Sequence, residues 1–197
     1  MTPELLPQLS WSLEDKGENI SCDGLTIKYI GSGDSESMIF TTNPVPKDVQ
    51  RYYFEATIHE QGKNGSIGIG LVKADRRNRN GRMPGWDIST VGYHGDDGGI
   101  FQNSGRPQMT SETFGKGDVV GCLFTRLCFY GFPFLRVNFI KNGIKLKVTR
   151  WLEDGDYYPA IGIASSGAII TTNMGGQSFI YNLIGNIIRT ILLWPLI

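Results

Sequence analysis

The stretch that decides the fold is residues 83–101, which read MPGWDISTVGYHGDDGGIF. Pro84 has a fixed φ and no backbone N–H, so Pro84-Gly85 marks the end of a loop. Trp86 is large and amphipathic, and we expect it to anchor that loop on a sheet beneath it. Residues 90–94 have the β-branched and aromatic composition of a strand. The glycines that follow bracket two aspartates, which is typical of a tight turn whose carboxylates bond their own backbone.

Sequences with a period of two lie upstream of this stretch. Residues 51–59 give the clearest alternation, with one buried face and one wet face; the buried set is Tyr52, Phe54, Ala56 and Ile58. Residues 25–30 predict a strand, and residues 38–41 predict its neighbour across a Gly/Ser/Asp turn. Within residues 66–72, Gly68 and Gly70 share one face, which would let another segment pack very close to the backbone.

The second half of the chain predicts further short strands. Residues 117–130 are apolar on both faces, which indicates a central strand between two layers. Asn142-Gly143 is the strongest hairpin signal, because a type I′ turn needs positive φ at both residues. Residues 157–164 and 168–172 predict two more strands. About a dozen short strands without a convincing helix predict an all-β fold, a two-sheet antiparallel sandwich.

Composition bounds the class of protein. The 197 residues suffice for one domain with a substantial core. Nineteen basic residues balance nineteen acidic ones, which disfavours a nucleic-acid partner. Cys22, Cys122 and Cys128 are interpreted as small buried hydrophobes in a reducing compartment, with one disulfide left open. Residues 1–9 lack the pattern of a signal peptide, and no apolar run approaches the ~20 residues of a membrane span.

Candidate catalytic and metal-binding residues are few. His94 lies close to Asp96 and Asp97, but the chain has only two histidines, and adjacent aspartates in a strand would point to opposite faces. A structural turn is therefore the preferred interpretation. The nucleophile pattern Gly-x-Ser-x-Gly and a phosphate-binding loop are both absent from the sequence. We expect no catalytic residue, no metal and no cofactor.

The densest charge in the chain is residues 76–82, RRNRNGR. Three interpretations stay open: a solvated loop, a basic targeting signal, or a contact for an acidic peptide. Loops on a rigid sandwich commonly carry binding residues, and the planar guanidinium group bonds a carboxylate through two nitrogens. We therefore weigh this loop as a partner contact about evenly with a solvated loop.

Seven motifs in register resemble a SPRY (B30.2/SPRY) domain, most closely its Ran-binding-protein-M-like branch. They are YYFE (52–55), PGW (84–86), GYHGDDG (92–98), IF (100–101), KGDVVG (116–121), KNG (141–143) and YPAIG (158–162). The resemblance covers about residues 11–181 and implies a concanavalin-like jelly roll. It divides the chain into an N-terminal lead (1–10), the SPRY domain (11–181) and a hydrophobic C-terminal tail (182–197). The apolar residues 127–135 exceed the family's shorter hairpin and predict a bulged turn or an exposed apolar tip.

The resemblance also implies a binding geometry. In SPRY proteins with a SOCS box, three loops on one edge of the sandwich hold short peptides, and the last loop carries a tryptophan. Ser166 stands at that position here, so the same peptide motif is not expected as a ligand. The predicted partner-binding residues are Pro44, Val45, Pro46, Arg77, Arg79, Arg82, Trp86, Ser165, Ser166 and Gly167. Ordinary connecting loops are the competing interpretation of all of them.

The sequence thus predicts a non-catalytic module that binds a protein or peptide, with an acidic ligand among the options. We expect a monomer that acts as a free-standing adaptor, decoy or host-directed effector, since free-standing SPRY domains of this branch resemble the secreted effectors of plant-parasitic nematodes. The expected location is the cytoplasm, or a host cell if a signal peptide is missing from this form. A lectin-like sandwich that binds carbohydrate is the alternative.

Overall fold

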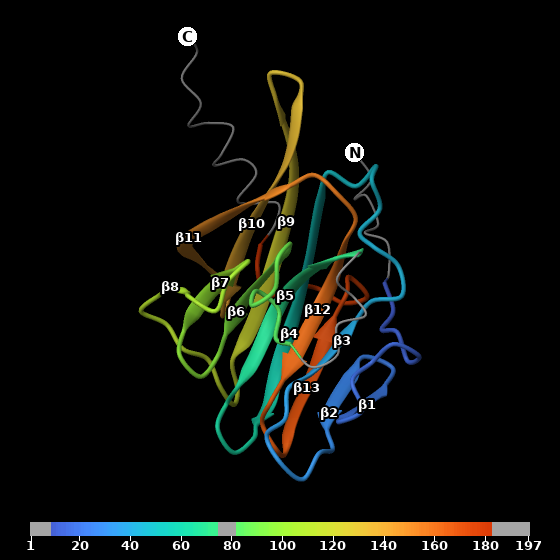
Figure 1. The fold of residues 1–197 in the computed structure, drawn as a ribbon, viewed down its shortest axis with the longest axis vertical. Coiled ribbons are helices and arrows are strands. Elements are labelled where there is room, and N and C mark those ends of the chain that lie inside the picture. Colours follow the sequence, from blue (N-terminus) through green and yellow to red (C-terminus); the bar gives the residue numbers. More distant parts are fainter. Residues whose placement is uncertain (1–8, 75–81, 183–197) are drawn as a thin grey trace.

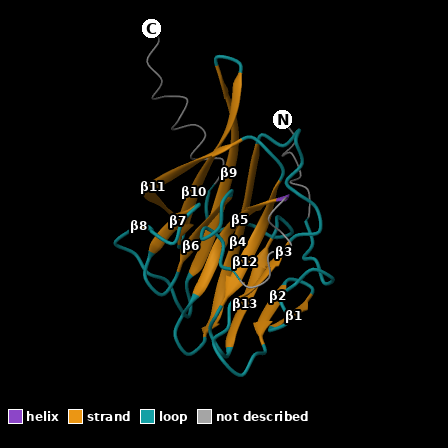
Figure 2. Cartoon of the chain, in the orientation of Figure 1, coloured by secondary structure: helices purple, strands orange, loops and turns teal. Residues whose placement is uncertain are grey.

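Two antiparallel β-sheets pack face to face in the computed structural model, which describes residues 9–74 and 82–182 (Figure 1). The described residues form thirteen strands and no α-helix. Figure 2 shows the strands of both sheets in orange. One sheet has seven strands, in the spatial order β1 (Ile20–Asp23), β2 (Thr26–Tyr29), β13 (Ala168–Asn173), β4 (Arg51–Gln61), β9 (Val119–Phe129), β10 (Phe132–Lys141) and β11 (Ile144–Glu153). The other has six, in the order β3 (Ser37–Phe40), β12 (Tyr157–Ile163), β5 (Ile67–Lys73), β6 (Thr90–His94), β7 (Gly99–Gln102) and β8 (Gln108–Met109). The predicted all-β sandwich is confirmed.

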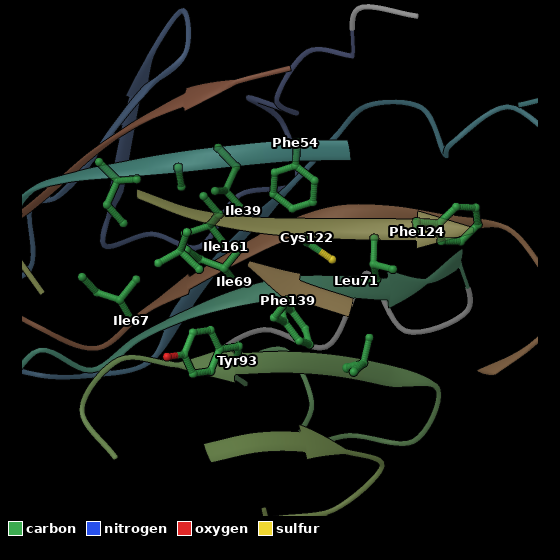
Figure 3. Packing of buried hydrophobic residues seen from close by; sticks show 14 of the residues in the cluster. Ile39, Phe54, Ile67, Ile69, Leu71, Tyr93, Cys122, Phe124, Phe139 and Ile161 are labelled. Carbon is green, nitrogen blue, oxygen red and sulfur yellow. The ribbon is translucent and has the colours of Figure 1, made fainter. Parts of the chain in front are cut away.

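The core lies between the sheets and is filled by alternate residues of the central strands (Figure 3). β4 contributes Phe54, β9 contributes Cys122 and Phe124, and β5 contributes Ile69 from the opposite sheet. Each of these side chains is at most 1% exposed. A buried aliphatic or aromatic side chain of this kind stabilises the fold by about 1.5–3 kcal/mol relative to exposure. The period of two that the sequence shows in residues 51–59 is therefore the period of core packing.

The outer face of β4 is wet only in part: His59 is exposed as predicted, but the middle of this face is buried, contrary to the prediction. Tyr53 and Glu55 are only 1% and 5% exposed, because residues 178–182 cross this face. The ring of Phe179 packs edge-on against Tyr53 with centroids 4.8 Å apart. Glu55 accepts hydrogen bonds from the Tyr53 hydroxyl (2.9 Å) and from the backbone N–H of Ile180 (3.1 Å). A carboxylate on a sheet face thus holds the chain that follows β13 in place.

A loop packs directly against glycines of the six-stranded sheet, as the sequence predicts for Gly68 of β5. A side chain at Gly68 would meet the Met83 methyl, and one at Gly162 would meet both Met83 and Pro84. A Cβ at Gly92 would overlap the Pro84 carbonyl oxygen. The PGW loop therefore lies directly on the backbone of the sheet, which only glycine permits.

β3 does not pair with β2, so the predicted neighbourhood of residues 25–30 and 38–41 is wrong. β2 pairs with β1 and β13, whereas β3 pairs with β12 in the other sheet. The chain between them crosses from one layer to the other. A short polar turn is equally compatible with a hairpin and with such a crossing, so the local sequence could not separate them.

Two hairpins frame β10. The β10–β11 turn has φ of 49° at Asn142 and 77° at Gly143, which confirms the predicted hairpin. The β9–β10 turn repeats this geometry at Tyr130 (φ 50°) and Gly131 (φ 82°). The hairpin projects beyond the sandwich at the end where β9 is labelled in Figure 1. The alternative of an exposed apolar tip is the one the structure shows, with Tyr130 87% exposed.

The three cysteines are all free thiols. Cys122 is buried in the core and burial raises the pKa of its thiol, as expected of a small hydrophobe. Cys22 is half-buried and Cys128 is exposed, so the prediction of three buried cysteines is wrong for these two. In residues 9–74 and 82–182, no helix has the length and apolar character needed to cross a membrane.

Candidate functional site

The turn between β12 and β13 is fastened to the turn between β4 and β5 by one side chain. Ser165 is fully buried, and its hydroxyl donates to the Gln61 carbonyl oxygen (2.8 Å). The Ser165 hydroxyl oxygen in turn accepts hydrogen bonds from the backbone N–H of Asn64 (3.2 Å) and of Gly65 (3.1 Å). The sequence predicts that Ser165 contacts a partner, but its buried hydroxyl makes all of its hydrogen bonds within the fold. Its role is to fix the relative position of two turns.

Ser166 links the same turn to a third segment. Its backbone N–H donates to the Asp34 carboxylate (3.2 Å), and its hydroxyl faces the Gly31 carbonyl oxygen at 3.4 Å. The Lys63 ammonium lies 3.9 Å from Asp34, and the Lys63 N–H donates to the Ser166 carbonyl oxygen (3.0 Å). Gly167 is exposed with φ of 86°. Residues 31–36, 61–66 and 165–167 together form one end of the sandwich, which we call the Ser165 end.

Arg82 lies beside this end. Its guanidinium pairs with the Asp87 carboxylate at 3.2 Å and is 59% exposed. Glu36, which follows the Asp34 turn, has its pKa raised by burial, and the charge of Arg82 opposes this shift. Arg77 and Arg79 lie outside the described residues, so their predicted contact stays a prediction. Of the basic residues 76–82, the structure describes only Arg82, whose charge acts on Glu36.

The Pro44–Val45–Pro46 loop lies at the opposite end. Val45 is fully buried, its N–H donates to the Tyr157 carbonyl oxygen (2.9 Å), and Pro44 and Pro46 are half-buried. Tyr157 begins β12, whereas Ser165 follows its other end, about 25 Å along an extended strand. The prediction that this loop shares an edge with Ser165 is wrong. The Pro44–Val45–Pro46 loop contacts the start of β12 and Ser165 follows its end, so the length of β12 separates them.

Trp86 anchors the PGW loop, as predicted. Its ring packs on Phe101 and on His94 of the sheet beneath, with centroids 6.0 and 5.4 Å apart. His94 is buried and its Nε2 bonds the Pro84 carbonyl oxygen (2.8 Å), so Nε2 carries the proton. Burial lowers the pKa of His94. The half-buried indole thus has a structural role, and its Nε1 is a buried donor without a partner among the described residues.

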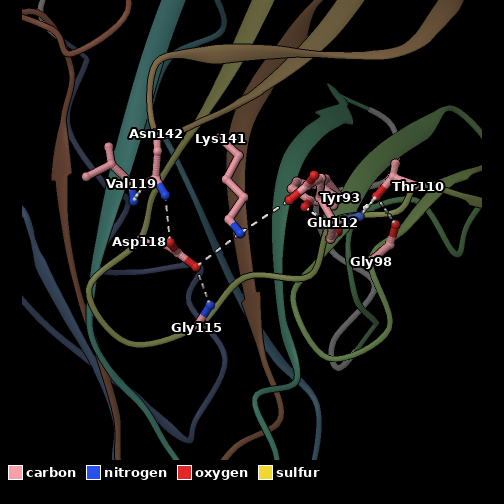
Figure 4. Close-up of polar contacts among 9 residues, drawn as sticks. All are labelled: Tyr93, Gly98, Thr110, Glu112, Gly115, Asp118, Val119, Lys141 and Asn142. Carbon is pink, nitrogen blue, oxygen red and sulfur yellow. Dashed lines mark hydrogen bonds and ion pairs between the residues drawn. The ribbon is translucent and has the colours of Figure 1, made fainter.

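A polar hollow of about 300 Å³ opens beside the Ser165 end. It is lined by Gln61, Asn64 and Gly65 on one side and by Asp96 and the loop 113–118 on the other. Hydrogen bonds brace that loop, and Figure 4 shows the polar network around it. The network members are Tyr93, Gly98, Thr110, Glu112, Gly115, Asp118, Val119, Lys141 and Asn142.

Asp118 is the centre of this network. Its carboxylate accepts from Asn142 Nδ2 (2.7 Å) and from the Gly115 N–H (3.0 Å), and Lys141 Nζ lies 3.6 Å away. Burial alone would raise the pKa of Asp118, but these hydrogen bonds and the charge of Lys141 lower it. The wall of the hollow is therefore held in one conformation by a carboxylate that stays ionised.

The His94-Asp96-Asp97 cluster is a turn, as preferred from the sequence. The Asp97 carboxylate accepts the Gly99 N–H at 2.7 Å. Among the residues described here, no group of three histidine, cysteine or acidic side chains is placed to hold a metal ion. The residues that sequence reasoning missed are 31–36 and 61–66. The Asn64-Gly65 turn signal marks the second, but only the fold brings Asp34 to Ser166, 132 positions apart.

The comparisons with known proteins identify the family. The family model described as SPRY domain matches residues 51–177. Ran-binding protein 10 of Danio rerio is 38% identical over 182 residues, and Ran-binding protein 9 of Homo sapiens is 36% identical over 182 residues. Each alignment covers 88% of this chain but only 28% and 24% of the relative. The Ran-binding protein M homolog of Arabidopsis thaliana is 29% identical over 84% of this chain.

Solved structures agree with the fold. A crystal structure of a human SPRY domain has a TM-score of 0.70 at 24% identity and covers 82% of this chain and 98% of its own. The SPRY domain of human HERC1 has a TM-score of 0.64 at 16% identity, with 85% and 99% covered. The chain spans about a quarter of the length of the Ran-binding proteins it matches. It belongs to the SPRY domain family, whose domains generally serve in protein–protein interaction, and its relatives are the Ran-binding proteins 9 and 10.

Proposed function

We propose that this chain is a non-catalytic module that binds a segment of another protein at the Ser165 end. The observation that carries the proposal is the set of hydrogen bonds from Ser165 and Ser166, which join residues 31–36, 61–66 and 165–167 before any partner arrives. Preformed loops lower the ordering cost of association. The hollow beside them offers backbone and side-chain polar groups for a partner's side chain.

The charge of this end is largely compensated internally. Lys63 faces Asp34, and Arg82 pairs with Asp87. Exposed pairs of this kind contribute about 0–1 kcal/mol and can be exchanged for contacts with a partner. The predicted contacts of Arg77 and Arg79 with an acidic ligand lie outside the described residues and stay predictions. The roles of adaptor, decoy or effector, the cytoplasmic location and the monomeric state stay predictions.

Proximity labelling with matched charge-reversal variants tests the docking end. Lys63→Glu with Arg82→Glu changes two exposed cations at the Ser165 end. Lys47→Glu with Lys145→Glu changes two exposed cations elsewhere, one of them next to Pro46 at the opposite end. Wild type and both variants are compared by quantitative proximity labelling in the same cells.

We expect the Lys63/Arg82 variant to lose specific partners that the Lys47/Lys145 variant retains. Recovery of the same proteins in the same amounts by all three would show that the Ser165 end is not the contact surface. Loss only in the Lys47/Lys145 variant would place the contact surface beside one of those two lysines instead of at the Ser165 end. Thermal unfolding of each variant confirms that the folded fraction is unchanged.

A further inference from the structure

A row of outward-facing residues crosses four strands of the seven-stranded sheet. Arg51 of β4 pairs with Thr125 of β9, Thr125 pairs with Arg136 of β10, and Arg136 pairs with Trp151 of β11. Cross-strand partners project from the same face of a sheet. Phe124 and Val137 are buried in the core and neighbour the row along their strands, so this row points outward. We call Arg51, Thr125, Arg136 and Trp151 the arginine row.

The arginine row has donors but no acidic partner. Among the described residues, neither Arg51 nor Arg136 forms an ion pair, although each is half-buried. The Nε of Arg136 and the hydroxyl of Thr125 are buried without a hydrogen-bond partner, and Thr125 is 3% exposed. Burial and the charge of Arg136 lower the pKa of Arg51, which reports like charges close together. Two half-buried cations beside unsatisfied donors are groups that an anion can satisfy with charge-assisted hydrogen bonds.

Exposed aromatic side chains continue from this row to the tip of the β9–β10 hairpin. Leu127 pairs with Phe134, and Phe129 pairs with Phe132, on the same face as the row. Phe129 and Phe132 are 62% and 75% exposed, and the Phe134 ring packs on Trp151 with centroids 5.3 Å apart. A set of exposed aromatic residues beside arginines is the composition typical of a protein-binding surface.

Neither the C-terminal residues 183–197 nor a second copy of this chain complements the positive charge of the arginine row. Residues 183–197 follow the segment that covers Tyr53, and they are rich in leucine and isoleucine, but they contain no aspartate or glutamate. Their side chains therefore supply no acceptor charge for Arg51 and Arg136. A second copy in a two-fold dimer would bring arginine row against arginine row, which like charges oppose.

We propose that the arginine row and the hairpin aromatics form a second docking surface, which binds a peptide segment of another protein with a carboxylate beside large apolar residues. The carboxylate accepts hydrogen bonds from the two guanidinium groups, and the apolar residues cover Phe129, Phe132 and Trp151. This surface is separate from the Ser165 end, because Arg51 lies roughly 30 Å along β4 from Gln61. A test of this second surface therefore does not depend on whether the Ser165 end binds a partner.

Selection from a phage-displayed library of random peptides on the full chain tests this surface. Enriched peptides are synthesised with a fluorescein label, each with a matched version in which glutamine or asparagine replaces the acidic residue. We expect the enriched peptides to combine Asp or Glu with aromatic or aliphatic residues. We expect the neutral version to bind roughly tenfold more weakly or worse, since charge-assisted hydrogen bonds are lost.

Protein variants assign the peptides to the surface. Arg51→Gln with Arg136→Gln weakens binding by about tenfold or more, whereas Lys145→Gln with Lys147→Gln, two exposed cations of β11, leaves it within about twofold. Thr125→Val weakens binding while leaving the melting temperature unchanged or raised, because its hydroxyl has no partner to lose. Loss of stability in this variant would contradict the view of an unpaired donor.

Other outcomes overturn the proposal. They are enrichment of no peptide, enrichment of peptides without an acid, or enriched peptides that bind the Arg51/Arg136 variant as tightly as wild type. A dimer in light scattering that dissociates on Phe129→Ser with Phe132→Ser would assign the surface to a second copy. A tenfold gain in peptide affinity on Leu192→Ser with Trp194→Ser would assign it to residues 183–197.

Discussion

Replacing Ser165 by alanine removes the group that joins two turns of the proposed docking end. Its buried hydroxyl makes three hydrogen bonds of 2.8, 3.1 and 3.2 Å, one as donor and two as acceptor. Each contributes about 0.5–1.5 kcal/mol net, and groups left unsatisfied by burial cost more. We therefore expect the free energy of unfolding to fall by about 2–4 kcal/mol, which corresponds to roughly 5–12 °C in Tm for a domain of this size.

Urea unfolding followed by tryptophan fluorescence measures this loss, and hydrogen exchange locates it. The amides of Asn64 and Gly65 donate to Ser165, so their exchange should accelerate more than that of the β9 core. Ser166→Ala is the matched control, because its hydroxyl makes only one bond, at 3.4 Å. It should cost less than about 0.5 kcal/mol.

A Ser165→Ala protein that loses less than about 0.5 kcal/mol and keeps its exchange pattern would refute the view that this residue fastens the two turns. A large stability loss with unchanged exchange at Asn64 and Gly65 would refute the local part of the argument. If the view is correct, binding at the Ser165 end weakens as well, although Ser165 touches no partner, because loosened loops must be ordered on association.

Three further perturbations test other parts of the structure. Gly92→Ala should cost about 3 kcal/mol or more in thermal unfolding, because its methyl would overlap a carbonyl oxygen of the PGW loop; a loss within about 0.5 kcal/mol would contradict that packing. Burial lowers the pKa of His94, so the unfolded chain binds a proton more readily than the native protein, and stability should fall as pH decreases below about 6.5. His94→Gln should flatten this dependence in urea titrations between pH 7 and 5, and an unchanged slope would assign it to other groups. Glu55→Ala should cost about 2–4 kcal/mol and accelerate exchange at Ile180, since it leaves that amide without its acceptor; slow exchange there would show that packing alone holds the segment.

Local patterns were sufficient for most of the architecture. The alternation in residues 51–59 identifies the core face of β4, and the Asn142-Gly143 pair identifies the β10–β11 turn, because both depend only on neighbours in sequence. The proximity of glycines in β5 correctly predicted a closely packed segment. Each of these features depends on a sequence segment shorter than about ten residues.

The failures that concern the candidate site and the covered face of β4 involve contacts between distant segments. Nothing near Tyr53 or Glu55 in sequence indicates that residues 178–182 will cover their face. Likewise, a loop before β4 and a loop after β12 carry no local sign of the end of the sandwich at which each lies. The hydrogen bond between Asp34 and Ser166 joins positions 132 residues apart, so the Ser165 end became visible only once the strand order was known.

The net charge of the chain does not reveal that the Ser165 end and the arginine row differ in local charge. Nineteen basic and nineteen acidic residues cancel over the chain, and at the Ser165 end they also cancel locally, through Lys63 with Asp34 and Arg82 with Asp87. At the arginine row they do not cancel, because strand register fixes Arg51 and Arg136 on either side of Thr125, on the same face of the sheet. Half-buried like charges are screened less by salt than exposed ones, so their repulsion persists in the free protein. An arriving carboxylate relieves that repulsion and gains two hydrogen bonds at once, so this face has the stronger electrostatic reason to prefer an acidic partner.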